Sequence, residues 1–342
     1  MTTAVMSHHK IDMQQESLRR EGAGGSRILA SAATFPALKR IALATIHLKK
    51  GGIREPHWHP NADEFTYCVD GKALVTLFSP QNICETMTLD KGEAVYIPKG
   101  ITHHIENIND GESNFILCFS HETPEEQNFS SALCTMSAHV LASTFGVPET
   151  TFEPLLEKRH DALISWKREV TKPAHASIPS LHKINLDGTN PQIAAPGGTG
   201  HVANRHTFPA AQNLSLVSLR MVPGSVREPH WHPDGTELNY VVAGEARLTV
   251  FSPDGEVDTF TLTRGQASTI PSGYFHHIEN IGRDELHMTV FFSSSLPGDI
   301  GISGALSAYA NDVLGASFDL DPKFFAALPK ISEDVLVVRG GG

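Results

Sequence analysis

The chain has 342 residues, 40% of them hydrophobic, which is enough for one large or two medium globular cores. Its formal net charge is -11, from 38 acidic and 27 basic side chains, and no basic stripe stands out, which argues against a nucleic-acid partner. It has no apolar run long enough for a signal peptide or a membrane span, so we expect a cytoplasmic protein with no membrane partner.

The chain contains a long internal repeat. The phrase "IREPHWHPNADE" begins at residue 53 and "VREPHWHPDGTE" begins at residue 226, a shift of 173 positions (226 − 53). The same shift aligns "TFPA" at 34–37 with "TFPA" at 207–210 without an insertion. Two copies of one domain are therefore predicted.

In chain order, residues 1–23 are polar and are predicted to form a flexible arm before a first domain at residues 24–164. Short alternating or β-branched segments, such as "FTYCV", "KALVTLF" and "FILCF", predict an all-β jelly roll or closed barrel. Each copy ends in a helical stretch. Residues 165–196 are rich in Pro, Gly and Ser and are the predicted connector to a second domain at residues 197–337.

The four cysteines all lie in the first half of the chain and have no CxxC spacing; they are Cys68, Cys84, Cys118 and Cys134. This arrangement indicates neither a disulfide framework nor a thiolate zinc site. We expect reduced and mostly buried thiols.

The repeated phrase predicts a metal site. His57 and His59 are separated by one residue, so on a strand both imidazoles point to the same face. Glu64 follows a turn, and His103 or His104 lies in the later segment "PKGITHHIEN". Three imidazoles and one carboxylate suit Mn(II), Fe(II), Ni(II) or Zn(II), and the lack of a thiolate favours a redox metal over structural zinc.

The second copy repeats this set with His230, His232, Glu237 and either His276 or His277. Eight of the 19 histidines lie in the motif pairs and recur at the shift of 173. Of the other eleven, His9 and His182 also match each other at this shift, and the remaining nine have no histidine counterpart. The recurrence argues against the alternative that these are solvated loop residues or ordinary core histidines.

These motifs resemble those of the bicupins, most closely the oxalate decarboxylase branch. The two cupin patterns appear here as Gly51, His57, His59, Glu64, Gly71 and as Gly92, Pro98, Gly100, His103, Asn107, and both recur in the second copy. The resemblance implies tandem double-stranded β-helix (jelly-roll) barrels with short trailing helices over residues 25–335. It also implies His103 and His276 as the fourth ligands, Mn(II) in each domain, dioxygen as a co-catalyst, and a homo-oligomer.

The phrase "REPHWH" adds Arg54 and Arg227, which the resemblance makes candidates to hold a small carboxylate substrate. A guanidinium fork can make two parallel charge-assisted hydrogen bonds to a carboxylate. The alternative is a surface arginine, or one paired with the neighbouring Glu55 or Glu228.

Decarboxylation also needs a group that moves a proton. In the branch this is a Glu on a five-residue lid, and here "SHETPEEQNFSS" offers Glu125 and Glu126, where the second copy has Gly298 and Asp299. The proton-carrying carboxylate is therefore expected in the first domain, although both residues could instead be solvated loop charges. The lid segment itself, "PEEQN", keeps the Glu but lacks the Ser and Thr neighbours typical of the branch.

The resulting expectation is a metal-dependent enzyme that converts oxalate to formate and carbon dioxide in domain one. In it Arg54 binds the substrate and Glu125 moves the proton. One alternative is an oxidase or dioxygenase of another organic substrate, which a large apolar pocket in the first domain would favour. The other is a non-catalytic metal-binding or storage cupin.

Overall fold

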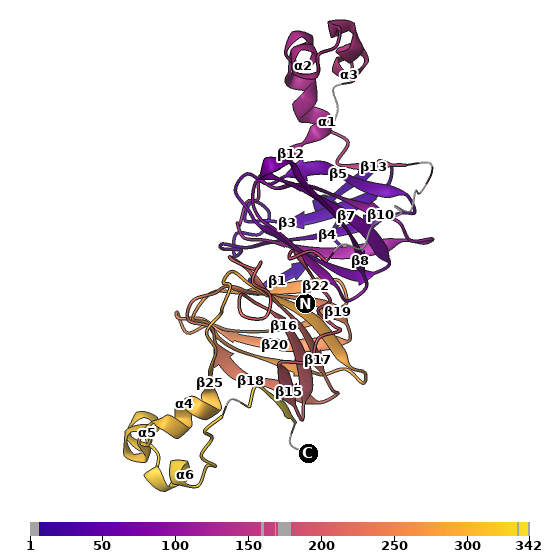
Figure 1. The fold of residues 1–342 in the computed structure, drawn as a ribbon. Helices are drawn as coiled ribbons and strands as arrows, with labels where there is room; N and C mark the ends of the chain where they lie inside the picture. The colour runs from indigo at the N-terminus through magenta and orange to yellow at the C-terminus, as the bar shows by residue number, and fades with distance from the viewer. Residues whose placement is uncertain (1–6, 159–160, 168, 170–178, 334, 341–342) are drawn as a thin grey trace, which may run out of the picture. The chain divides into compact units, whose positions relative to one another are not determined.

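The structure is a computed structural model that describes residues 7–158, 161–167, 169, 179–333 and 335–340. The chain divides into two compact units (Figure 1). The first unit contains residues 15–36 and 40–188, and the second contains residues 1–14, 37–39 and 189–342. The boundary after Gly188 falls within the predicted connector, of which residues 168 and 170–178 lie outside the described residues.

Two antiparallel sheets form the first unit. The seven-stranded sheet contains, in spatial order, β14 (Lys183–Ile184), β9 (Ala94–Ile97), β6 (Glu64–Asp70), β11 (Ser113–Phe119), β4 (Ala42–Leu48), β3 (Gly25–Ala30) and β2 (Arg19–Gly22). The six-stranded sheet contains β12 (Gln127–Asn128), β5 (Gly52–Trp58), β10 (Thr102–Asn107), β7 (Lys72–Ser79) and β8 (Ile83–Asp90), with β13 (Ile164–Trp166) also paired to β5.

The second unit repeats this architecture. Its seven-stranded sheet contains β1 (Lys10–Asp12), β22 (Gln266–Ile270), β19 (Glu237–Ala243), β24 (Leu286–Phe292), β17 (Ser215–Met221), β16 (Gly198–Ala203) and β15 (Ile193–Ala195). Its six-stranded sheet contains β21 (Val257–Thr263), β20 (Glu245–Phe251), β23 (Phe275–Asn280), β18 (Ser225–Trp231) and β25 (Ile300–Gly301), with β26 (Val337–Arg339) also paired to β18. The all-β jelly-roll prediction is confirmed, in the form of two facing sheets rather than a closed barrel.

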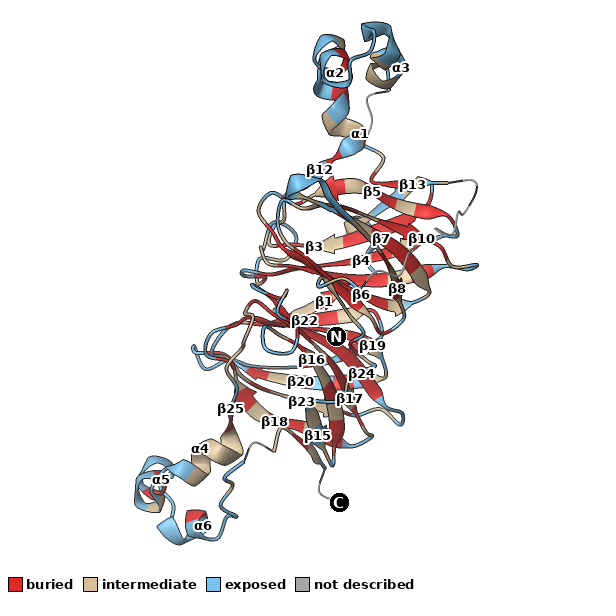
Figure 2. Cartoon of the chain, in the orientation of Figure 1, coloured by how far each residue is buried: buried red, intermediate tan, exposed pale blue. Residues whose placement is uncertain are grey.

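The core of each unit lies between its two sheets, where buried residues dominate (Figure 2). In β4, Ala42, Ala44, Ile46 and Leu48 occur at every second position and all enter the core cluster. Residues Ala73, Val75 and Leu77 of β7 do the same from the opposite sheet. The strand period of two residues thus places one apolar face of each strand inside.

Gly71 occupies the corner where the chain leaves β6 in one sheet and enters β7 in the other. Its φ of 92° is a conformation that favours glycine, and a Cβ there would lie 2.1 Å from Ser113 Oγ. Gly244 occupies the matched corner of the second unit with φ 88°. At both glycines the chain therefore passes from one sheet of the unit to the other.

Short helices follow the strands of each unit and project away from its sheets (Figure 1). They are α1 (Phe129–Ala132), α2 (Ala138–Phe145) and α3 (Glu153–Leu156) in the first unit, and α4 (Ile302–Ala308), α5 (Asn311–Phe318) and α6 (Pro322–Ala326) in the second. Ser137 caps the start of helix α2, because its side chain accepts from the Val140 amide at 3.2 Å, and Gly146 caps its end with φ 67°.

The expectation of a flexible arm at residues 1–23 is wrong for its described part, residues 7–23. Strand β1 pairs with β22 and extends the sheet of the second unit, whereas β2 pairs with β3 in the first. The Ile11 side chain is buried, and His9 Nδ1 lies 3.0 Å from the Thr269 carbonyl oxygen. The polar sequence hides the pairing because edge strands gain backbone hydrogen bonds without an apolar run.

Among the described residues, no helix combines the length and apolar character needed to cross a bilayer.

Candidate metal and anion sites

Each unit contains one buried cluster of three histidines and one glutamate. The members are His57, His59, Glu64 and His103 in the first unit, and His230, His232, Glu237 and His276 in the second. Within each cluster the potential ligand atoms all lie within 4.8 Å of one another. The structure therefore brings together the eight residues that the sequence predicted as ligands.

Strand register explains the convergence. His57 of β5 and His103 of β10 are direct cross-strand partners, and their ring centroids are 4.1 Å apart. His59 lies just beyond the end of β5, and Glu64 opens β6 in the facing sheet. The site thus lies between the two sheets, and the second unit repeats the pairing with His230 and His276.

The histidines are oriented by carbonyl groups on their outer side. In the first unit, Nδ1 of His57, His59 and His103 lies 2.7, 2.8 and 2.9 Å from the carbonyl oxygens of Glu55, Glu125 and Ile101, respectively. A proton on each Nδ1 leaves each Nε2 lone pair for a metal. Nε2 of His103 is buried and makes no hydrogen bond, which fits a position reserved for an ion.

The charges of the cluster also suit a divalent cation. Burial opposes ionisation of Glu64, but His103 and His59 outweigh burial and hold the pKa of Glu64 well below its usual range. Burial, together with the charges of Arg54 and the neighbouring histidines, lowers the pKa of His57 well below its ordinary value. An ionised carboxylate beside neutral imidazoles is the state that binds metal.

A buried arginine lies close to the first cluster. Arg54 is 1% exposed, and its Nη2 lies 2.6 Å from the Glu126 carboxylate. Its Nη1 donates to Asn128 Oδ1 at 3.0 Å and to the Leu163 carbonyl at 2.9 Å. The buried Arg27 contacts the same oxygen of Glu126. One internal carboxylate therefore joins two buried arginines.

The two candidate acids of the first unit lie in different environments. Burial disfavours ionisation of Glu126, but Arg54 and Arg27 outweigh it and lower the pKa of Glu126 to about 2. The Glu125 side chain is exposed, and the backbone of this residue, rather than its side chain, contacts the metal cluster. Its amide donates to Asn61 Oδ1 at 2.8 Å, and its carbonyl accepts from His59.

The second unit has a matching arginine–carboxylate pair, in which an aspartate replaces the longer glutamate. Arg227 contacts Asp299, which occupies the position of Glu126 at the shift of 173. The carbonyl of Gly298, at the position of Glu125, lies 2.6 Å from His232 Nδ1. A carboxylate beside the arginine is thus present in both units, whereas the Glu125 carboxylate of the first unit has no counterpart at Gly298.

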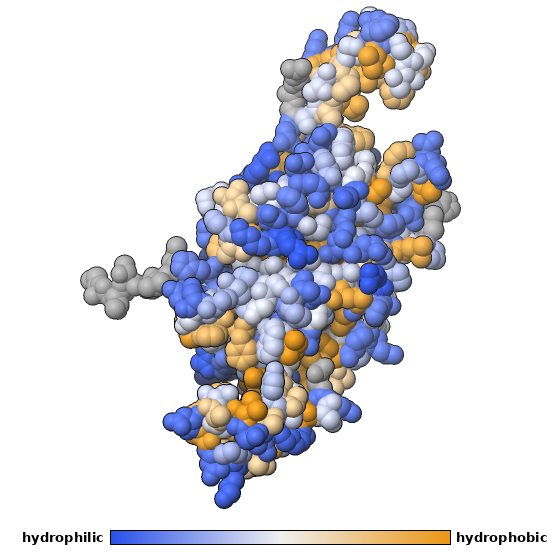
Figure 3. All heavy atoms as spheres, turned by 90° about the vertical axis from the view of Figure 1, so that its left-hand side faces the viewer, coloured by the Kyte–Doolittle hydropathy of each residue, from blue (hydrophilic) through white to orange (hydrophobic). Residues whose placement is uncertain are grey.

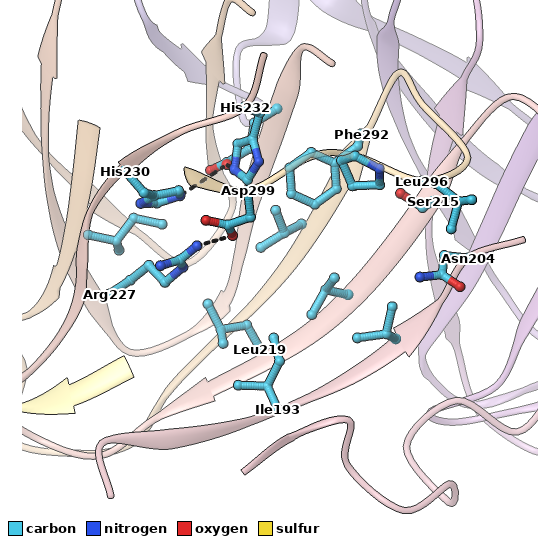
Figure 4. Close-up of a pocket in the computed structure, with 16 residues that line it drawn as sticks. Ile193, Asn204, Ser215, Leu219, Arg227, His230, His232, Phe292, Leu296 and Asp299 are labelled. Carbon is cyan, nitrogen blue, oxygen red and sulfur yellow. Dashed lines mark hydrogen bonds and ion pairs between the residues drawn. The ribbon is translucent and has the colours of Figure 1, made fainter. Parts of the chain in front are cut away.

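The second cluster opens into a cavity of about 200 Å³ (Figure 4). Arg227 and Asp299 lie near His230 and His232 at one end, and apolar side chains line the walls. The apolar pocket that would favour an oxidase or dioxygenase thus occurs in the second unit, whereas the prediction named the first.

Two site residues were not predicted from the sequence in these roles. Arg27 lies in β3 among small and apolar residues, and an arginine there that faces the core was a detectable signal. Asp299 was noted only as the counterpart of Glu126 and not as the partner of Arg227.

Comparison with known proteins places these observations in a family. The cupin domain profile matches residues 11–152 and 184–324. The oxalate decarboxylase OxdC of Bacillus subtilis is 28% identical over 341 residues, covering 97% of this chain and 87% of the relative. A probable oxalate decarboxylase of Arthroderma benhamiae is 30% identical over 296 residues, covering 84% of this chain and 72% of the relative.

Comparison with solved structures also finds oxalate decarboxylases. A structure of the Bacillus subtilis oxalate decarboxylase at pH 4.6 matches with a TM-score of 0.86 and 26% identity, covering 99% of this chain and 89% of that chain. Another, from work on the Mn(II) centres of that enzyme, also matches with a TM-score of 0.86 and 25% identity. The chain belongs to the cupin family, as a two-domain member of its oxalate decarboxylase branch.

Proposed function

We propose that the protein decarboxylates oxalate to formate and carbon dioxide at the site of the first unit, with Mn(II) held in each unit. The observation that carries this proposal is the pair of buried arginines, Arg54 and Arg27, that meet one carboxylate beside the four metal ligands. The names of the relatives and the Mn(II) centres of the Bacillus subtilis enzyme support it. When bound, manganese would supply, together with dioxygen, a one-electron oxidation of oxalate.

Arg54 has the geometry to receive a substrate carboxylate. Glu126 pairs with both Arg54 and Arg27, so its carboxylate occupies the position of an anion. An incoming oxalate takes over these guanidinium groups and releases Glu126. The exchange conserves charge-assisted hydrogen bonds, so neither arginine is left buried and unpaired.

Glu125 is the proposed proton carrier. The oxalate monoanion loses its proton to Glu125, the carbon–carbon bond breaks to release carbon dioxide, and the same proton returns to the remaining carbon to give formate. The Glu125 side chain is exposed, so a movement of the segment 121–128 has to turn it toward the metal ligands before it can act. Displacement of Glu126, its chain neighbour, supplies a reason for that movement.

The test is ¹³C NMR of manganese-loaded protein incubated with ¹³C-oxalate at mildly acid pH. Wild type should release formate and carbon dioxide in equal amounts, and Glu125→Gln should lower kcat at least 100-fold while still binding oxalate. Arg27→Met should mainly raise KM. Release of no formate by wild type would refute the proposed reaction.

Of the alternatives, an oxidase or dioxygenase would find the apolar cavity it needs in the second unit, beside Arg227, rather than at the site proposed for oxalate. A storage role is disfavoured because both ligand sets are complete.

We further infer a homo-oligomer. Large apolar side chains are exposed at matched helix positions in both units, Val140 and Phe145 in α2 and Val313 and Phe318 in α5. Figure 3 shows hydrophobic surface on the projecting helices. Such patches mark association surfaces. Light scattering after size-exclusion chromatography should give a multiple of the 37.1 kDa chain mass, and a monomer at micromolar concentration would contradict the inference.

A further inference from the structure

We propose that the cavity of the second unit is a binding site for an aromatic monocarboxylate with a distal hydroxyl group, distinct from the oxalate site of the first unit. The cavity has three parts: a polar end at the metal cluster and Arg227, an apolar body, and a single unbonded hydroxyl at the far end, from Ser215 (Figure 4). This complementarity does not depend on the reaction at the first site.

The polar end recognises one carboxylate. Arg227 is the one arginine or lysine among the described residues that line the cavity, and its Nη2 contacts one carboxylate oxygen of Asp299. At the position of the first unit's Arg27, the second unit has Gly200. The second guanidinium that suits oxalate is therefore missing from this site.

The apolar body accounts for the shape of the ligand. Ile193 stands where the first unit has Arg20, and Val217 where it has Ala44; with Leu219, Val290 and Phe292 these residues form an apolar wall. Apolar cavities of about 150 Å³ bind benzene. A cavity of about 200 Å³ therefore has room for one ring with a carboxylate.

The far end selects for a hydrogen-bonding group. Ser215 is 1% exposed, lines the cavity, and its Oγ has no hydrogen-bond partner. A buried hydroxyl without a partner is costly, and a ligand hydroxyl would satisfy it. The first unit has Ala42 at this position, so the feature belongs to the second unit alone.

The test is calorimetric titration of manganese-loaded, full-length protein with 4-hydroxybenzoate and with benzoate. We expect one 4-hydroxybenzoate per chain. Ser215→Ala should lower the affinity for 4-hydroxybenzoate about five- to tenfold, because the ligand hydroxyl loses its hydrogen bond to Ser215. The affinity for benzoate should change by less than about twofold, because benzoate has no hydroxyl group to bond to Ser215. Arg227→Gln should weaken both ligands at least tenfold, and the matched first-unit variant Arg54→Gln should leave both within about twofold. Asp299→Asn should raise the affinity for both ligands, because it removes the internal carboxylate that competes with them for Arg227.

Three results would overturn the proposal: no binding of either ligand to wild type, loss of binding in Arg54→Gln instead of Arg227→Gln, or equal weakening of both ligands by Ser215→Ala. The Ser215→Ala comparison removes one atom that has no partner, so it stays informative even if Arg227→Gln does not fold.

Discussion

Replacing Glu126 with glutamine should destabilise the first unit by about 3 kcal/mol at pH 7. Glu126 has an ordinary pKa of 4.5, which the folded protein lowers to about 2 because Arg54 and Arg27 outweigh the effect of burial. A pKa lowered by roughly 2.5, at about 1.4 kcal/mol for a change of one in pKa, gives an upper value of about 3.5 kcal/mol, which partial exposure reduces to about 3 kcal/mol. The Glu126 side chain is 15% exposed, so solvent screens the ion pairs only weakly.

The sign of the pH dependence follows from the lowered pKa. The stabilisation is complete above pH 4.5 and is lost as the pH falls toward 2, so at pH 3 less than about half of it remains. Urea unfolding of metal-free protein in a Trp231→Phe background reports on the first unit through Trp58 and Trp166. Glu125→Gln is the control, expected within about 0.5 kcal/mol of wild type because its side chain is exposed. An unchanged unfolding free energy in Glu126→Gln, or a loss that grows at acid pH, would refute the reasoning.

Three further predictions concern other parts of the chain. The Thr66 hydroxyl donates to the Glu64 carboxylate at 2.5 Å, so Thr66→Val should lower the manganese affinity of the first site about tenfold or more and leave that of the second site unchanged. Two equal affinities in an EPR titration would show that Thr66 does not support the metal ligand Glu64. Cys84 is exposed, whereas the other three cysteines are buried, and burial raises the pKa of Cys68 to about 12. A thiol reagent should therefore label one cysteine in the native chain and four in urea. Labelling of a second cysteine in the native chain as fast as Cys84 would contradict the burial of the other three. Deletion of residues 1–14 removes β1 and should lower the melting temperature of the second unit but not that of the first; equal losses in both would contradict the pairing with β22.

The metal clusters could be predicted because strand geometry is periodic. Two histidines separated by one residue share a face, and the pairing of β5 with β10 then leaves little freedom for His103. The same spacing of three histidines and one glutamate occurs in both copies of the repeat, which argues against a chance match to a metal-site pattern. The alternation of small and apolar residues likewise predicted which face of β4 is buried.

The positions of the acids could not be predicted because they lie in a segment without a period. Sequence spacing cannot say which of two adjacent glutamates turns inward, and in the ligand-free structure it is Glu126 that reaches Arg54. Arg27 escaped prediction because its partner is 99 residues away. The pairing of β1 with β22 joins segments more than 250 residues apart, and no local pattern records it.

The Glu126 carboxylate is proposed to occupy the anion site of the first unit until oxalate replaces it. A crystal structure of manganese-loaded Glu125→Gln with oxalate tests this most directly. We predict oxalate between the first metal cluster and Arg54, with Glu126 displaced from Arg54 and the Arg227–Asp299 pair unchanged. An intact Arg54–Glu126 pair, with oxalate bound beside Arg227, would contradict the account.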